Sequence, residues 1–330
     1  MAKSTVVIPN FNGIKYIGAC LDSLYMGTVK DLEVVVVDNG SADGSMELVR
    51  DQYPQVRLIA NKKNTGFCHA VNQGIQASTT PYVILLNNDT RVDLSFVHEL
   101  EKVMDADTEK KIFSASAKLI SLYEKDKTDD AGDFYCALGW AFARGKGKNP
   151  DRYHRDCEIF AACAGAAIYR RELLEEKRVG LFDEVHFAYL EDIDIGYRAK
   201  IHGYINWFAA NSIVYHAGSA TSGSRYNAFK TRIVARNSVY LIYKNMPAAQ
   251  IILNFPLLFA GYLTKLMFFT RKRLGKEYLM GFMDGIRISM KISMEGKGKT
   301  YRKRQKKVSK MVYVKIQFGL WRNLFRLFEM

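Results

Sequence analysis

Asp89 stands at a point in the chain where an acidic side chain could bind a metal ion. It ends the tripeptide Asn87-Asn88-Asp89, which follows the apolar run 82–86. Carboxylate oxygens suit Mg²⁺ and Mn²⁺, and in phosphate-handling enzymes one or two carboxylates bind the ion together with substrate phosphates. An Asp that caps a turn is the alternative, and the tripeptide alone leaves both interpretations open.

Two further positions carry side chains that could do chemistry. Glu191 and Asp192 are adjacent at the expected start of a helix, where a carboxylate either caps free backbone N–H groups or acts as a general base. His216 ends an apolar run and is followed by Ala-Gly-Ser. A histidine at such a strand end is either structural or part of a site.

The elements that must position these residues alternate between strand and helix. Short apolar runs rich in β-branched residues predict buried strands, and apolar residues at helical spacing between them predict helices. The predicted strands are 4–8, 32–37, 56–60 and 82–86, and the predicted helices are 14–25, 41–50 and 67–77. This alternation is typical of an α/β fold with a mostly parallel sheet.

Polar residues follow each of these four strands. Ligands of such sheets bind beyond the carboxyl ends of the strands, so four polar clusters at one edge predict one polar site. The clusters are 9–12, 38–41, 61–66 and 87–89. A last strand is predicted at 206–215, directly before His216, whereas 105–155 shows no regular pattern.

Seven segments in this order resemble the family 2 inverting glycosyltransferases with a GT-A fold, especially their bacterial rhamnosyltransferase-like branch. Together they cover about residues 4–220, and the set is specific for the family and its fold. The segments are VVIPNFNG (6–13), VVVVDNGSADGS (34–45), NTGFCHAVNQG (64–74), VILLNNDT (83–90), GAAIYRRELLEEKRVGLFDE (165–184), YLEDIDIGYRAKIHGY (189–204) and VYHAGSA (214–220).

The resemblance implies that the loops after the first four strands bind a nucleotide-diphospho-sugar. Asp38 matches the acid that reads the uracil or thymine ring, since a carboxylate can accept a hydrogen bond from the base N3–H. Gly66 matches a position where the backbone approaches the ligand closely. The other residues implied in donor binding are Pro9, Asn10, Asn12, Asn64, Phe67, Asn87 and Asn88.

The resemblance also implies a Mg²⁺ or Mn²⁺ ion held by Asp89 and His216, and Asp192 as the catalytic base. Asn87 stands where the family's D-x-D motif has its first acid, so Asp89 is expected to carry most of the ligation. The ion would neutralise the leaving diphosphate, and the base would take the proton of the acceptor hydroxyl. A single displacement inverts the anomeric carbon and needs no enzyme nucleophile.

The resemblance further implies that the donor is dTDP-rhamnose and that L-rhamnose passes to a lipid-linked or growing cell-surface glycan. Another UDP- or dTDP-hexose is the nearest alternative. The sequence has no Gln-x-x-Arg-Trp motif, which processive synthases of the family usually carry. One or a few transfers are therefore expected rather than processive synthesis.

The charge of the chain is concentrated at one end. The 330 residues have a net charge of +14, with 25 Lys and Arg against 30 Asp and Glu in 1–224, and 23 against 4 in 225–330. The 48% hydrophobic content and six prolines exclude a disordered chain. We therefore expect a catalytic GT-A domain at 1–220 and a basic helical region at 221–330, whose charge points to a polyanionic partner.

The apolar content of the basic region favours an anionic membrane surface as that partner. Residues 248–269 are apolar but include Gln250, Asn254 and Lys265, so helices lying in the membrane interface are favoured over a span. Residues 311–330 are amphipathic, and anionic headgroups attract such basic segments. Nucleic-acid binding without catalysis would explain the charge but not the apolar stretch, and a tail for homo-oligomer formation is the other alternative.

The cysteines and the N-terminus predict where the chain works. The five cysteines show no paired spacing, which is typical of reduced thiols, and the N-terminus enters a strand-like run without a secretory signal. Together with the basic region, these features predict an enzyme at the cytoplasmic face of the cell membrane.

Overall fold

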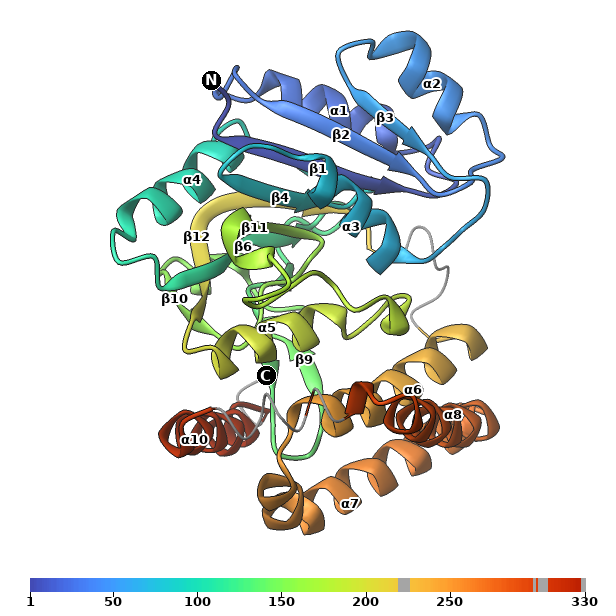
Figure 1. Ribbon diagram of the computed structural model, residues 1–330. Helices are drawn as coiled ribbons and strands as arrows, with labels where there is room; N and C mark the ends of the chain where they lie inside the picture. Colours follow the sequence, from blue (N-terminus) through green and yellow to red (C-terminus); the bar gives the residue numbers. More distant parts are fainter. Residues whose placement is uncertain (219–225, 299–300, 302–307, 328–330) are drawn as a thin grey trace.

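The computed structural model describes residues 1–218, 226–298, 301 and 308–327, and Figure 1 shows a sheet-containing body with a layer of helices beneath it. In the first half, four parallel strands have the order β3-β2-β1-β4. They are β1 (Ser4–Asn10), β2 (Glu33–Asp38), β3 (Arg57–Ala60) and β4 (Tyr82–Leu86). Helices α1 (Ile17–Met26), α2 (Ser45–Gln52) and α3 (Phe67–Ala77) connect them. The predicted α/β alternation is confirmed.

The second half of the sheet is mixed. Strand β11 (Ala166–Arg170) runs antiparallel to both β4 and β6 (Ile112–Ser121), and β12 (Ile205–His216) runs parallel to β6. Shorter strands complete it: β10 (Cys157–Ile159) and β5 (Thr90–Val92) pair with β12, and β7 (Thr128–Asp130) pairs with β6. A separate hairpin is formed by β8 (Asp133–Tyr135) and β9 (Ala141–Ala143). The helical elements here are α4 (Phe96–Ala106), α5 (Glu191–Ile201), η1 (Pro150–Arg152), η2 (Arg171–Leu174) and η3 (Glu184–His186).

Strand β6 lies in the middle of the sheet although its sequence does not read as a buried strand. Ser114, Ser116 and Lys118 interrupt its apolar residues, yet all three are buried. Their polar groups have partners: Ser114 Oγ lies 2.8 Å from Asn206 Oδ1, and Lys118 Nζ lies 3.4 Å from the carbonyl oxygen of Tyr153. The irregular structure expected at 105–155 is therefore wrong for this strand, because partners distant in sequence compensate for burial of its polar groups.

Alternation along the strands divides the core between the two faces of the sheet. On β1, Val7 packs into the cluster that includes residues of α3 and α5, whereas Val6 and Ile8 pack into the cluster that includes residues of α1 and α4. Successive side chains of a strand point to opposite faces, so a continuous Val/Ile run fills both clusters. The sheet is thereby buried on both faces, and the polar loops lie at the edge where the carboxyl ends of the parallel strands meet.

The C-terminal part is helical, as predicted. It consists of α6 (Ala228–Asn245), α7 (Ala248–Arg271), α8 (Gly275–Met294) and α10 (Lys310–Arg326), which lie on the α5 side of the sheet in Figure 1. Leu241 of α6 and Ile316 and Leu320 of α10 are buried in the same cluster as the strands. The predicted boundary at 220/221 falls within 219–225, outside the described residues, as does most of the basic run 297–310.

Helix α7 is the most exposed apolar helix of this layer. By length and composition it could cross a membrane, and only 17% of its apolar window is buried. Its buried face includes Gln250 and Asn254, whose amides are paired: Asn254 Nδ2 lies 2.9 Å from Gln317 Oε1 of α10. Gln250 and Asn254 therefore face α10, whereas Lys265, the third polar residue that argued against a span, lies over the ring of Trp140. Whether α7 lies in a membrane interface stays a prediction.

Candidate functional site

Loops at the carboxyl edge of the sheet border a cavity of about 930 Å³. Most residues predicted from the sequence line it: Pro9, Asn10, Asn64, Phe67, Asn87, Asn88, Asp89, Asp192 and His216. The rest of the wall comes from five places in the chain: the loop after β2, the segment before β11, the loop before α5, the start of α5 and the start of α6. These residues include Asn39, Cys163, Phe187, Glu191, Phe229 and Lys230. Asn12, Asp38 and Gly66 are not among the lining residues.

One wall of the cavity is a network of side-chain amides. Asn10 Nδ2 lies 2.8 Å from Asp38 Oδ2, and Asn10 Oδ1 accepts a hydrogen bond from Asn88 Nδ2 at 2.7 Å. Asp38 is 1% exposed and also accepts from the backbone N–H of Ser41 at 2.9 Å. It therefore orients the Asn10 amide from behind the lining, and its predicted contact with a nucleobase stays a prediction.

Gly66 and Asn12 shape the loops behind this wall. Gly66 has φ 93°, and a Cβ there would lie 2.5 Å from the Phe187 ring, so only glycine lets the start of α3 pack against Phe187. Asn12 has φ 51°, and its Oδ1 accepts from Ala42 N at 3.0 Å, which joins the first two loops. Asn39 Nδ2 lies 3.1 Å from Asn64 Oδ1, a contact that joins the second loop to the third. The sequence pattern does not single out Asn39.

Asp89, His216 and Asp129 form a hydrogen-bonded row at the edge of the cavity. Strand β12 pairs with β5 so that His216 lies opposite Thr90, next to Asp89. His216 Nε2 lies 3.2 Å from Asp89 Oδ1, and its Nδ1 lies 2.8 Å from Asp129 Oδ2. Burial alone would lower the pKa of His216, but the hydrogen bonds and charges of the two aspartates raise it to about 9.

This row fits a divalent cation. The contact of Nδ1 with Asp129 orients the ring, and Nε2 and Asp89 Oδ1, which lie 3.2 Å apart, could both ligate one ion once Nε2 has lost its proton. A second carboxylate behind a ligating imidazole is the usual support of such a ligand. Asp129 is therefore a supporting residue that the sequence pattern did not reveal. It is positioned by β7, which pairs with β6, and Lys146 forms an ion pair with it.

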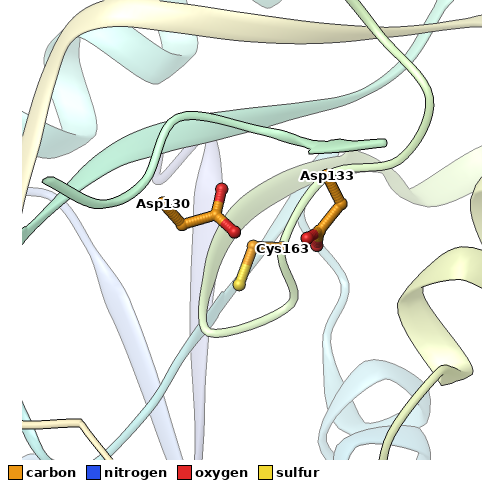
Figure 2. A group of neighbouring side chains, drawn as sticks. All are labelled: Asp130, Asp133 and Cys163. Atoms are coloured by element: carbon orange, nitrogen blue, oxygen red, sulfur yellow. The ribbon is translucent and has the colours of Figure 1, made fainter. Parts of the chain in front are cut away.

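A second part of the cavity wall, at the start of α5, carries the carboxyl groups of Glu191 and Asp192. Asp192 lies at the start of α5, where its Oδ1 accepts from the Ile193 N–H at 2.7 Å. Its carboxyl hydrogen-bonds to Asp133, which also hydrogen-bonds to Asp130. Figure 2 shows Asp130, Asp133 and Cys163 pointing toward one another, with ligand atoms within 4.8 Å.

Burial raises the pKa values of the carboxyl groups in this wall above the usual range. It raises the pKa of Asp130 to about 7, and raises the pKa values of Asp133 and Asp192 above the value for an exposed Asp. Glu191 is buried as well, which raises its pKa, and its Oε2 has no hydrogen-bond partner among the described residues. Adjacent buried carboxyl groups cannot all be ionised, so protons are shared within this cluster near neutral pH.

Sequence reasoning missed Asp129, Asp130 and Asp133. They lie in the 105–160 region, where β7 pairs with β6 and β8 follows it, so that Asp129 contacts His216 and Asp133 contacts Asp192. The one local signal is their spacing, three acids in five residues around Gly132, which has φ 100° and makes the turn between β7 and β8.

Comparison with known sequences gives the following relatives. A family model described as Glycosyl transferase family 2 matches residues 5–177. The N-acetylglucosaminyl-diphospho-decaprenol L-rhamnosyltransferase of Mycobacterium tuberculosis is 24% identical over 229 residues, covering 62% of this chain and 72% of the relative. Glycosyltransferase GlyA of Streptococcus pneumoniae is 32% identical over 102 residues, which cover 30% of this chain and only 15% of GlyA.

Comparison with solved structures supports the same fold. The crystal structure of GalNAc-T7 with UDP, GalNAc and Mn²⁺ matches with a TM-score of 0.60, covering 74% of this chain and 48% of that chain at 16% identity. Likeness at this level of identity shows the fold alone, and it confirms the predicted GT-A fold.

Proposed function

Because the chain belongs to glycosyl transferase family 2, we propose that it moves a sugar from a nucleotide-diphospho-sugar to an acceptor hydroxyl with inversion, using Asp192 as the catalytic base. The observation that carries this proposal is that Asp89 and His216 line the same cavity as Asp192, although the three residues come from different elements. The diphosphate of the donor and the proton acceptor would therefore lie in the same cavity.

The residues present fit a Mg²⁺ or Mn²⁺ ion held by Asp89 and His216. When bound, such an ion neutralises the charge of the leaving diphosphate. The amides of Asn10 and Asn88 lie beside these ligands and offer polar contacts to the donor, and Asp38 fixes the Asn10 amide. The Mn²⁺ named for GalNAc-T7 supports this assignment by analogy of fold.

Asp192 is proposed to take the proton of the acceptor hydroxyl as that oxygen attacks the anomeric carbon. The proton passes to the Asp192 carboxylate, the new glycosidic bond forms, and the bond to the nucleoside diphosphate breaks. Since burial raises the pKa of Asp192, the carboxylate is a stronger proton acceptor than an exposed Asp. The hydrogen bond with Asp133 favours the ionised form of Asp192 and offsets part of the rise that burial causes in its pKa.

We propose L-rhamnose from dTDP-rhamnose as the transferred sugar and a lipid-linked glycan as the acceptor. The support is the mycobacterial rhamnosyltransferase, whose match covers most of its own length and whose name gives a decaprenol-linked acceptor. Another UDP- or dTDP-hexose is the alternative donor, and the UDP in the GalNAc-T7 structure favours it.

We propose that the C-terminal helices bind an anionic membrane at its cytoplasmic face. Large apolar side chains are exposed along three helices, with the basic residues 271–273 at the end of α7. The exposed apolar side chains include Ile252, Phe255, Phe259 and Met267 of α7, Met280, Met283 and Met290 of α8, and Phe318 and Phe325 of α10. A nucleic acid would match the charge but not this apolar surface.

A donor panel tests the proposed function. The full-length chain is incubated with dTDP-rhamnose, UDP-glucose, UDP-N-acetylglucosamine or GDP-mannose and Mn²⁺ or Mg²⁺, and release of nucleoside diphosphate is followed. Fastest release from dTDP-rhamnose supports rhamnosyl transfer, and fastest release from a UDP-sugar supports the alternative. Release from none of them contradicts a transferase with these donors.

A further inference from the structure

The loop that leads into Asp192 has a backbone conformation that its residues seldom adopt by themselves. Residues 185–190 join η3 to α5, and Phe187, Tyr189 and Leu190 have φ values of 63°, 68° and 65°. Such values are unfavourable for each residue that is not glycine. Three of them within four residues need contacts from elsewhere to persist.

Helix α6 makes those contacts with two consecutive residues. Asn237 is completely buried, and its Nδ2 lies 2.7–2.9 Å from the carbonyl oxygens of His186, Ala188 and Tyr189. Arg236 Nη2 lies 2.7 and 2.8 Å from two carbonyl oxygens at the start of the same loop. Arg236 Nε also donates to Asn237 Oδ1 at 2.9 Å, which orients the amide with its N–H groups toward the loop.

The same helix holds the segments on either side of the loop. Lys244 Nζ lies 2.6 Å from Asp183 Oδ2, just before η3, and 2.8 Å from Asp194 Oδ2, in the first turn of α5. Asn245 Nδ2 lies 2.7 Å from Asp194 Oδ1. Contacts from α6 therefore reach the chain before, within and after the loop, on both sides of Asp192.

Helix α8 packs directly on the helical turn of α6 that includes Arg236. A Cβ at Gly285 would lie 2.6 Å from the carbonyl oxygen of Arg236, and a Cβ at Gly281 would lie 2.1 Å from that of Arg232. These two glycines let the backbones of α6 and α8 meet. The loop, α6 and α8 thus form consecutive layers, and α8 is one of the helices with exposed apolar residues.

We propose that Asn237 is a positioning residue, which holds the 185–190 loop in its strained conformation and so directs the Asp192 carboxyl into the cavity. This inference rests on the proposed role of Asp192. It makes α6 a part of the active site, although α6 belongs to the C-terminal region. Loss of the Asn237 amide would remove its contacts with three carbonyl oxygens of the loop and leave that of His186 to Arg236 and Ala188 N, and the loop would relax toward ordinary negative φ values.

The test compares Asn237→Ala with Asn254→Ala in the full-length chain. Asn254 is a matched control because it is also completely buried and hydrogen-bonded, but between α7 and α10. Asn237→Ala is expected to lower kcat about 10²-fold, while the calorimetric Kd for UDP with Mn²⁺ stays within about twofold. Asn254→Ala is expected to lower the Tm to a similar extent and to leave kcat within about threefold.

Hydrogen exchange gives a second readout that does not depend on turnover. Backbone amides of 186–192 should exchange faster in Asn237→Ala and at the wild-type rate in Asn254→Ala. Equal losses of kcat in both variants, or unchanged exchange in Asn237→Ala, would overturn the inference. A wild-type chain without transferase activity would refute the proposed function, whereas the exchange rates would still decide whether Asn237 holds the loop.

Arg236→Ala keeps the inference testable if Asn237→Ala does not fold. Arg232→Ala is its control, since Arg232 lies one turn earlier on α6 and pairs with Asp284 of α8. Faster exchange at 186–192 and lower kcat are expected for Arg236→Ala alone. The same behaviour in both arginine variants would contradict a specific role of the loop contacts.

Discussion

The two walls of the cavity are built from different chemical groups. On the side of β1 and β4, the amides of Asn10 and Asn88 are hydrogen-bonded to each other. Asp89, His216 and Asp129 form a second row, in which each ring nitrogen of His216 lies next to a carboxylate. On the side of α5, carboxyl groups crowd together and burial raises their pKa values. The first wall carries the groups proposed to bind the donor and the cation, whereas the second wall carries the proposed catalytic base.

This difference means that binding and proton transfer can be disrupted separately. A change on the amide wall should weaken the donor complex, because the groups that would contact it are lost. A change on the carboxyl wall should slow turnover while the donor still binds. The predictions below test that separation, beginning with the largest expected effect.

Asp192→Asn removes the proposed proton acceptor from the carboxyl wall. Asparagine keeps the shape of the side chain but cannot take the acceptor proton, so kcat is expected to fall by about 10²–10⁴-fold. Release of nucleoside diphosphate in the presence of acceptor measures the loss. Glu191→Gln is the control: burial raises the pKa of Glu191 and so favours its neutral form, which glutamine imitates, and turnover should fall less than about fivefold. Near-normal turnover of Asp192→Asn would exclude it as the base.

Asp89→Ala removes the carboxylate ligand from the amide wall. Binding of UDP in the presence of Mn²⁺ is expected to weaken by about 10²-fold, since His216 alone would hold the ion. Calorimetric titration with and without Mn²⁺ gives the cation-dependent part. Asp93→Ala is the matched control, because Asp93 caps the turn before α4 and does not line the cavity. An unchanged titration of Asp89→Ala would refute the assignment.

Asp129→Asn changes the support of His216 rather than a ligand. Asparagine can still accept from Nδ1 but lacks the charge that orients and polarises the ring, so cation-dependent UDP binding should weaken by about tenfold. Titrations at several Mn²⁺ concentrations should show that the loss shrinks as Mn²⁺ is raised. A loss that does not depend on Mn²⁺ would place Asp129 outside the support of the cation site.

Asp130→Asn should give the smallest effect, on stability rather than on turnover. A carboxyl whose pKa is raised in the folded protein, here from 3.8 to about 7, favours folding most at low pH and loses this contribution as pH rises toward 7. Asparagine does not ionise, so the Tm of the variant relative to wild type should rise by a few degrees between pH 5 and pH 8. Parallel Tm profiles of the two proteins would contradict the burial argument.

The contrast between the walls also separates what the sequence could predict from what it could not. The strands and helices of the amide wall follow from local patterns, and the predicted bounds of 67–77 and 82–86 are those observed for α3 and β4. The polar residues after these strands meet because parallel strands end at one edge.

The carboxyl wall depends on pairings between distant segments. The buried Ser and Lys residues of β6 break its apolar pattern. Asp129 meets His216, and Asp133 meets Asp192, only because β7 folds back onto β6 and β8 follows it. Likewise, the contact of Asn237 with the 185–190 loop joins residues about fifty positions apart. No local pattern carries such information, since the partners are selected by tertiary packing.

The most direct test of the separation between the walls is a calorimetric titration of Asp192→Asn with UDP and Mn²⁺. If the amide wall binds the donor and the carboxyl wall handles the proton, the Kd of this inactive variant stays within about twofold of wild type. Loss of cation-dependent binding in Asp192→Asn, to the extent expected for Asp89→Ala, would contradict the account.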